Sequence, residues 1–172
     1  MADTLLNAFR FEASLRRSAQ IESGSDTQAD PNALPTGTPL GDGAFQECSG
    51  LEIEMDVQEY QEGGRNDGII RRVGCAKYTT LVLKRGMFYG ADKKVNSQLW
   101  GWLQGIVSGG AVVRYDGIIS VKSADNKLVV ATWVFERGLP AKIRGPQLNA
   151  RTGEIAIEEL HIAHEGLRLV EI

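Results

Sequence analysis

Strict alternation of apolar and polar side chains is the clearest signal in this sequence, and it is strongest over residues 51–58. The apolar members are Leu51, Ile53, Met55 and Val57. Glu52, Glu54 and Asp56 lie between them, on the opposite face. A period of two predicts a half-buried strand. We therefore expect the apolar face to enter the core and the acidic face to meet water.

Similar patterns predict five further strands along the chain. They cover residues 9–16, 78–85, 112–122, 128–137 and 154–162. The segment 128–137 is apolar on both faces, so we expect both to be buried. In 154–162 the alternation changes phase at Glu158 and Glu159, which predicts a β-bulge with one extra residue.

One segment has helical periodicity. Apolar residues recur at helical spacing from Val95 to Val107, which predicts an amphipathic helix. Asn96 or Ser97 is suited to cap its start and Gly109 to end it. On the side away from the stripe lie Gly101 and Gly105. Glycine costs a helix about 1 kcal/mol relative to alanine, so the pair is either a tolerated weakness or a smooth face that another backbone approaches closely.

Two segments rich in glycine, proline and polar residues separate these elements. Residues 22–43 predict a long loop, and residues 61–76 predict a protruding loop or hairpin tip. The order of strands, one helix and more strands lacks a βαβ repeat. We therefore predict a single domain over 1–172, mainly β in class (α+β): a small antiparallel β-barrel or two packed sheets with one α-helix.

Composition narrows the functional classes. The chain has 172 residues, a hydrophobic content of 42% and a net charge of −3, which is ordinary for a globular protein and not typical of a nucleic-acid binder. Neither a signal-peptide pattern nor a run of about 20 apolar residues is present. We expect assembly in the cytoplasm and no direct membrane binding.

Candidate chemistry is sparse. His161 and His164 are three apart in a predicted strand, so they point to opposite faces and make a poor metal pair. Cys48 and Cys75 form neither a disulfide framework nor a Cys-x-x-Cys pair. No phosphate-binding, dinucleotide-binding or nucleophile-elbow motif occurs. The sequence predicts no enzyme, no metal and no cofactor.

The sequence also resembles a known protein family over nearly its whole length. The sequence resembles the tail tube (inner tube) proteins of contractile phage tails and phage-tail-like contractile injection systems. The resemblance is carried by residues 50–52, 59–66, 77, 83–86, 99–102, 140–142, 145–150 and 159–167. Val73-Gly74 departs from the family pattern, and so does the long stretch 23–43.

The resemblance implies a structural protein related to the type VI secretion tube component. It implies stacked hexameric rings of this chain inside a sheath, started by baseplate or tube-initiator proteins, with DNA or effector protein as cargo in the lumen. The predicted inter-ring or subunit interface is Gly63, Gly64, Arg65, Asn66, Arg71 and Arg72. Glu52, Glu54 and Asp56 are predicted to face the lumen, and Gly101 and Gly105 the sheath.

Two alternatives stay open. A tube initiator or baseplate ring protein of the same system resembles the tube protein itself and differs in forming a single ring. A β-barrel ligand-binding protein would need a cluster of perturbed titratable groups around a pocket. The sequence does not distinguish a phage tail, a bacteriocin and an injection particle.

Overall fold

Strand β7 (Val129–Arg144) bends once and thereby belongs to two sheets. The computed structural model describes residues 5–19, 34–40, 45–64, 68–151 and 153–170. The remaining strands are β1 (Phe11–Arg17), β2 (Glu47–Ser49), β3 (Ile53–Tyr60), β4 (Ile70–Tyr78), β5 (Leu81–Gly86), β6 (Tyr115–Lys122), β8 (Ile157–Ala163) and β9 (Gly166–Val170). The helix is α1 (Gln98–Val107).

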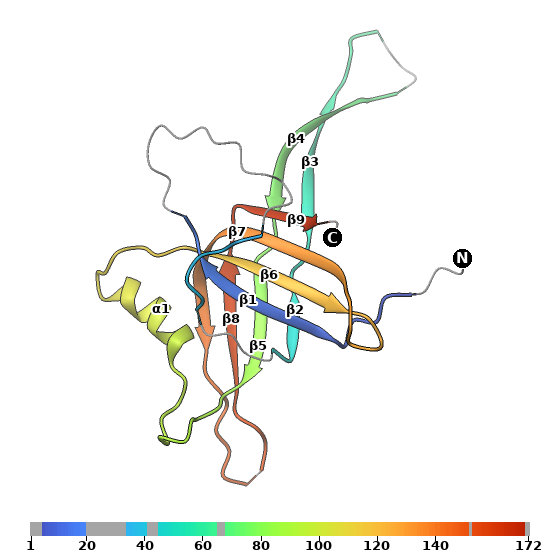
Figure 1. Cartoon of the computed structure of the whole chain (residues 1–172). Coiled ribbons are helices and arrows are strands. Elements are labelled where there is room, and N and C mark those ends of the chain that lie inside the picture. Colours follow the sequence, from blue (N-terminus) through green and yellow to red (C-terminus); the bar gives the residue numbers. More distant parts are fainter. Residues whose placement is uncertain (1–4, 20–33, 41–44, 65–67, 152, 171–172) are drawn as a thin grey trace.

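The hydrogen-bonded order of the main sheet is β1-β6-β7-β8-β5-β2, with β9 on β7, and all pairs are antiparallel (Figure 1). Within the described residues the path stays open between β1 and β2, so the fold is two packed sheets and not a closed barrel. The predicted mainly β class is confirmed. The core between the sheets consists of Ala13, Leu15, Phe45, Leu81, Leu83, Leu99, Trp102, Ile119, Phe135, Leu160 and Ile162.

The bend in β7 is fixed at Arg137, which has a φ of 54°. Its backbone N–H donates to Asp116 Oδ1 at 2.8 Å, and its side chain pairs with Glu165 at 2.7 Å. Arg114 pairs with the other oxygen of Glu165, also at 2.7 Å. These charged hydrogen bonds hold a strained backbone position at the corner between the two sheets.

Helix α1 forms where the periodicity predicts it. Leu99 and Trp102 are its buried residues, and the Trp102 indole donates to the Val113 carbonyl at 2.8 Å. Asn96 accepts a hydrogen bond from the Gln98 N–H at 3.2 Å, and Gly109 has a φ of 86°, as a glycine beyond a helix end commonly does. The helix prediction is therefore confirmed.

The predicted bulge at Glu158 and Glu159 is wrong. Strand β8 pairs with β5 in continuous register, and Glu158 points inward on the same face as Leu160 and Ile162. The phase of the apolar pattern changed because a charged residue occupies a core position. Glu158 is 1% exposed and pairs there with Arg85, which is also 1% exposed. The register shift is instead in β7, between Pro140 and Lys142.

A second expectation is only half correct. Strand β7 is buried at Thr132, Val134 and Phe135. Its first two residues, Val129 and Val130, are exposed, and so is the preceding Leu128. The apolar run therefore extends past the end of the core. Most of the predicted loop 22–43 lies outside the described residues.

Candidate assembly interface

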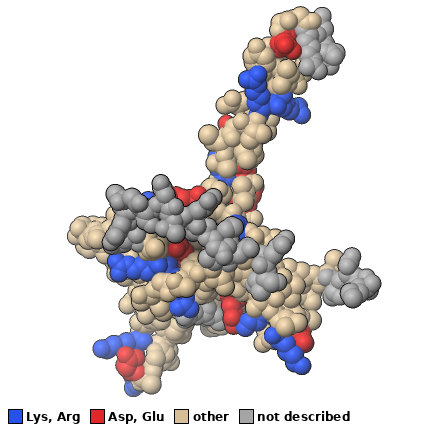
Figure 2. Space-filling view, turned by 45° about the horizontal axis from the view of Figure 1, so that its top comes forward, with Lys and Arg blue, Asp and Glu red and all other residues tan. Residues whose placement is uncertain are grey.

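Strands β3 and β4 form a separate two-stranded sheet that projects from the body of the molecule (Figure 1). This arm comprises residues 52–64 and 68–78 among those described, and it stands clear of the remaining surface in Figure 2. The expectation that its apolar face enters the core is wrong. Ile53, Met55 and Val57 are 52%, 48% and 54% exposed. Only Leu51, at the root of the arm, packs partly against the core.

The arm has one apolar face. Directly paired residues in an antiparallel ladder share a face. The pairs on this face are Ile53 with Tyr78, Met55 with Ala76 and Val57 with Val73. All six side chains are exposed. A continuous apolar strip therefore remains uncovered along the arm.

The opposite face of the arm is polar, and its acids do not stand alone. Glu54 is paired with Lys77 and Gln58 with Arg72. The guanidinium of Arg72 lies 4.9 Å from the centre of the Tyr60 ring, a cation–π contact. The acidic row of Glu52, Glu54 and Asp56 is thus mixed with basic groups from β4, some of which are visible along the arm in Figure 2.

A bulge bends the arm at Gly74. Between the pairs Met55–Ala76 and Val57–Val73 the strand β4 has one residue more than β3. A Cβ at Gly74 would lie 2.8 Å from the Asp56 carbonyl oxygen and 3.1 Å from its Cβ. Glycine permits this close approach of two backbones, which gives a structural reason for the glycine at position 74.

The tip of the arm carries the predicted interface residues. Gly63 and Gly64 are exposed, and a Cβ at either would meet no atom of the described residues within 4 Å. The Arg71 Nε lies 3.5 Å from Glu59 Oε1 on the neighbouring strand and forms an ion pair with it. Arg65 and Asn66 lie outside the described residues. Arg71 and Arg72 belong to β4, so the predicted loop 61–76 is shorter than expected and ends where β4 begins at Ile70.

His164 anchors the root of the arm. Its Nε2 donates to the Thr79 carbonyl at 3.1 Å, and its ring lies against both Tyr78 of the arm and Phe135 of the core, at 5.5 and 5.6 Å between centroids. Burial lowers the pKa of His164 below its ordinary value, outweighing backbone hydrogen bonds at Gly166 and Thr79 that raise it. No pattern in the sequence indicates this role of His164.

This pKa shift makes stability depend on pH. The unfolded chain binds a proton at His164 near pH 6.5, whereas the folded protein does so only at lower pH. We expect the melting temperature to fall as the pH drops from 7.5 to 5. His164→Gln keeps a donor to Thr79 without a charge, so its melting temperature should fall less over the same range. Parallel curves for the two proteins, measured by circular dichroism, would contradict this assignment.

The helix glycines border an apolar groove. Gly101 and Gly105 lie with Leu40, Trp102, Ile106 and Tyr115 around a cavity of about 460 Å³. A Cβ at either glycine would meet no atom of the described residues within 4 Å. Within the part of the chain that is described, nothing covers the face predicted to bind a sheath.

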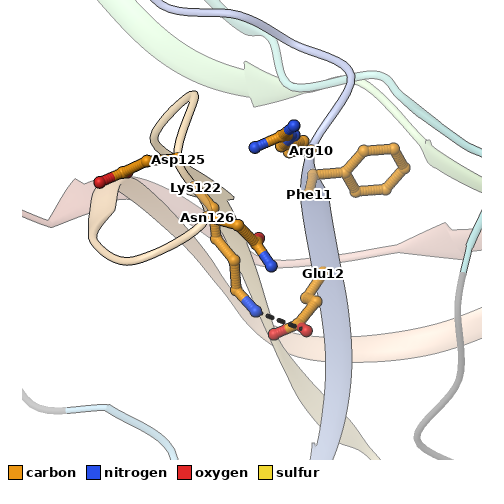
Figure 3. Close-up of a pocket in the computed structure, with 6 residues that line it drawn as sticks. All are labelled: Arg10, Phe11, Glu12, Lys122, Asp125 and Asn126. Atoms are coloured by element: carbon orange, nitrogen blue, oxygen red, sulfur yellow. Dashed lines mark hydrogen bonds and ion pairs between the residues drawn. The ribbon is translucent and has the colours of Figure 1, made fainter.

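A second cavity, of about 520 Å³, is polar and lies between the start of β1 and the β6–β7 turn (Figure 3). Its charged groups are already paired. Lys122 Nζ contacts Glu12 at 2.7 Å, Arg10 donates to the Ala124 carbonyl, and Asp125 accepts from Ser123. The Ser123 hydroxyl and the Lys127 N–H hold the pKa of Asp125 below its usual range. The arrangement fits a braced turn better than a ligand site.

Each of the two histidines has a contact of its own: His161 Nε2 hydrogen-bonds Glu159 Oε1, and the His164 ring lies against Phe135 of the core. Among the described residues no three potential ligands gather. Cys48 and Cys75 are free thiols, and burial raises the pKa of Cys48 to about 12. In the part of the chain that is described, no helix has the length and apolarity needed to span a membrane.

Comparison with protein families matches residues 7–168 to the model described as T4-like virus tail tube protein gp19. A chain in the anti-feeding prophage baseplate is similar in structure, with a TM-score of 0.74, 21% identity and coverage of 98% of this chain and 97% of that chain. A chain of the sheath–tube complex of an extracellular contractile injection system has a TM-score of 0.73 and 21% identity, with coverage of 98% of this chain and 93% of that chain. A type six secretion system protein has a TM-score of 0.50 and 8% identity, with coverage of 92% of this chain and 82% of that chain. A search of curated sequences gives no significant match.

Proposed function

This chain belongs to the T4-like virus tail tube protein gp19 family, and from that premise we propose that it forms the inner tube of a contractile particle as stacked hexameric rings. Membership of this family makes the chain a structural component of the tube or baseplate of a phage tail or phage-tail-like particle. We further propose that a sheath surrounds this tube and that its lumen carries DNA or effector protein. Assembly is proposed to take place in the cytoplasm.

The arm carries this proposal. A two-stranded hairpin is marginally stable in water unless its apolar face packs on something. Here that face has no cover within the described part of the chain. Large exposed apolar strips on soluble proteins mark contact sites. We propose that a second copy of the chain supplies this cover in the assembled tube.

Sheet edges offer a second kind of contact between copies. The strand path ends at β1 and β2, and β9 pairs only with β7. Edge strands expose unpaired backbone groups that readily pair with another chain. We propose that these edges join neighbouring copies within a ring.

Sheath binding at the Gly101 and Gly105 face of α1 remains part of the proposal, supported by the open space above both glycines. The lumen position of Glu52, Glu54 and Asp56 stays a prediction. It is weakened by the basic residues paired across from them. The proposal includes no catalytic residue and no cofactor.

The second candidate is a tube initiator or baseplate ring of the same system. It is favoured by the baseplate chain, which is as similar to this protein as the sheath–tube chain is. Both candidates need the arm to contact another copy or component. They differ in the length of the polymer.

The test compares the two faces of the arm. Met55→Asp/Val57→Asp puts charges on the apolar face, and Glu54→Ala/Gln58→Ala alters the polar face of the same strand. Both pairs are exposed in the free chain, so we expect changes in stability within about 0.5 kcal/mol. Electron microscopy should show loss of assemblies only for the first variant. Wild-type assemblies from both would refute the arm as the contact.

A further inference from the structure

We propose that the carboxylates of Glu47 and Glu159 prevent a polyanion such as DNA from binding to the outer face of the half-sheet formed by β2, β5, β8 and the second half of β7. They do so by neutralising the basic side chains of that face, which are Lys84, Lys142 and Arg144. The inference rests on the proposed function, in which cargo moves along the particle, and it names the residues that keep one face from retaining a polyanionic cargo.

The half-sheet has one face in the core and one face outside. Its strands are hydrogen-bonded in the order β7-β8-β5-β2 (Figure 1). Successive side chains of a strand point to opposite faces. Leu83 and Arg85 are each 1% exposed on the core side of β5, so Lys84 between them points outward. In β8, Leu160 is buried on the core side in the same way, so its neighbour Glu159 points outward.

A row of alternating charges crosses the outer face from strand to strand. Glu47 of β2 is directly opposite Lys84 of β5. Lys84 is in turn opposite Glu159 of β8, which is opposite Arg144 of β7. We call these four residues the charge ladder. Neighbouring strands lie about 4.8 Å apart, so each basic side chain of the ladder has a carboxylate on the next strand, and such cross-strand pairs attract each other.

Both carboxylates of the ladder already have partners. Lys84 Nζ lies 2.9 and 3.0 Å from the two Glu47 oxygens, and this hydrogen bond raises the pKa of Lys84. Glu159 Oε1 lies 2.5 Å from His161 Nε2. That hydrogen bond, together with the positive charges of Arg144 and Lys84, holds the pKa of the Glu159 carboxyl below its usual range. Lys84 and Glu159 therefore keep their charges at neutral pH.

Alternation at this spacing weakens the attraction that a polyanion meets. Opposite charges about 4.8 Å apart largely cancel within one Debye length, which is about 8 Å at physiological salt. Binding to DNA draws its affinity from basic groups that displace counterions from the phosphates. Here the basic groups of the ladder have carboxylate neighbours instead. Without those two carboxylates, the described residues of this face comprise Lys84, Lys142 and Arg144 and no acidic residue.

The test measures binding of a fluorescein-labelled DNA duplex by fluorescence anisotropy, at protein concentrations where wild type sediments as a single chain. The ladder variant, Glu47→Gln/Glu159→Gln, removes both charges and keeps side-chain size, so it should bind at least about 10-fold more tightly than wild type. With three phosphate contacts, its affinity should fall about 40-fold between 50 and 200 mM salt. Adding Lys84→Gln/Arg144→Gln to the ladder variant should abolish the gain.

The matched control is Glu12→Gln/Glu54→Gln, which changes the net charge by the same amount on other surfaces. Glu12 pairs with Lys122 at 2.7 Å. Glu54 is directly opposite Lys77 in the arm. The control should bind DNA no more tightly than wild type. The proposal is overturned by equal gains for both double variants, by a folded ladder variant that gains no affinity, or by a wild type that binds as tightly as the ladder variant.

Circular dichroism verifies that each variant folds. If the ladder variant does not fold, Glu47→Gln alone keeps the test, because the Glu47 side chain is 50% exposed and its loss releases Lys84. This single variant should bind DNA about 3-fold more tightly than wild type, and unchanged binding would overturn the proposal. Binding is measured on unassembled chains, so a wild type that never assembles would refute the proposed function without changing this result.

Discussion

Glu158→Ala should lower the free energy of unfolding by about 3–5 kcal/mol, because it leaves the guanidinium of Arg85 buried without its charge partner. The Arg85 Nε lies 2.5 Å from Glu158 Oε1, and the Trp100 indole donates to Glu158 Oε2 at 2.9 Å. The Arg85 Nη1 and Nη2 atoms have no hydrogen-bond partner among the described residues. The Arg85 Cζ lies 5.9 Å from the centre of the Phe45 ring and 5.3 Å from that of Phe88, and these cation–π contacts compensate the charge less well than a carboxylate does.

Urea unfolding measures the effect, and a double variant controls for the origin of the loss. Arg85→Met/Glu158→Leu removes both charges and fills the space with apolar groups, so it should recover most of the lost stability. A single Glu158→Ala variant that loses less than about 1 kcal/mol would show that the buried pair is not needed for stability. Because Trp100 lies in α1, loss of the pair should also loosen the helix on the sheet.

Gly117→Ala is expected to cost about 2–3 kcal/mol by overpacking. A Cβ at this position would lie 1.9 Å from Phe135 Cε1, and the Phe135 side chain is completely buried. The ring also blocks Gly138 from the other side, where a Cβ would approach Phe135 Cε2 to 2.7 Å. The ring is held between two glycine backbones and has no room to move.

The matched control is the same substitution in open space. Gly101→Ala adds a methyl group that meets no atom within 4 Å, in a helix that favours alanine, so it should raise stability by up to about 1 kcal/mol. Opposite signs for the two variants in urea unfolding are the expected result. Equal effects at Gly117 and Gly101 would mean that crowding by Phe135 does not decide the outcome.

Local patterning predicted much of the fold. The period of two located β1 and β3, and helical spacing located α1, because each of these elements places its side chains at regular intervals. A run rich in β-branched and apolar residues located β5. The bend of β7 was not predictable, since Arg137 with positive φ gives no pattern in the sequence. The bulge predicted at Glu158 is absent because an alternating pattern places a carboxylate on the solvent face, whereas Glu158 is buried against Arg85.

The sequence predicted where the candidate interface lies in the chain, but not that its apolar face is exposed. Alternation in β3 identifies an apolar face, yet it does not tell whether the same chain or another copy covers it. In β4 the alternation is hidden by the bulge at Gly74 and by Arg71 and Arg72, so the sequence predicts a loop or hairpin tip where the second strand of the arm lies.

Electron cryo-microscopy of the purified wild-type protein over a range of concentrations tests the central claim most directly. The account predicts hollow stacks of rings in which each β3–β4 arm lies with its apolar face against another copy. Particles that remain single chains at every concentration, or stacks in which the apolar face of the arm stays in water, would contradict it.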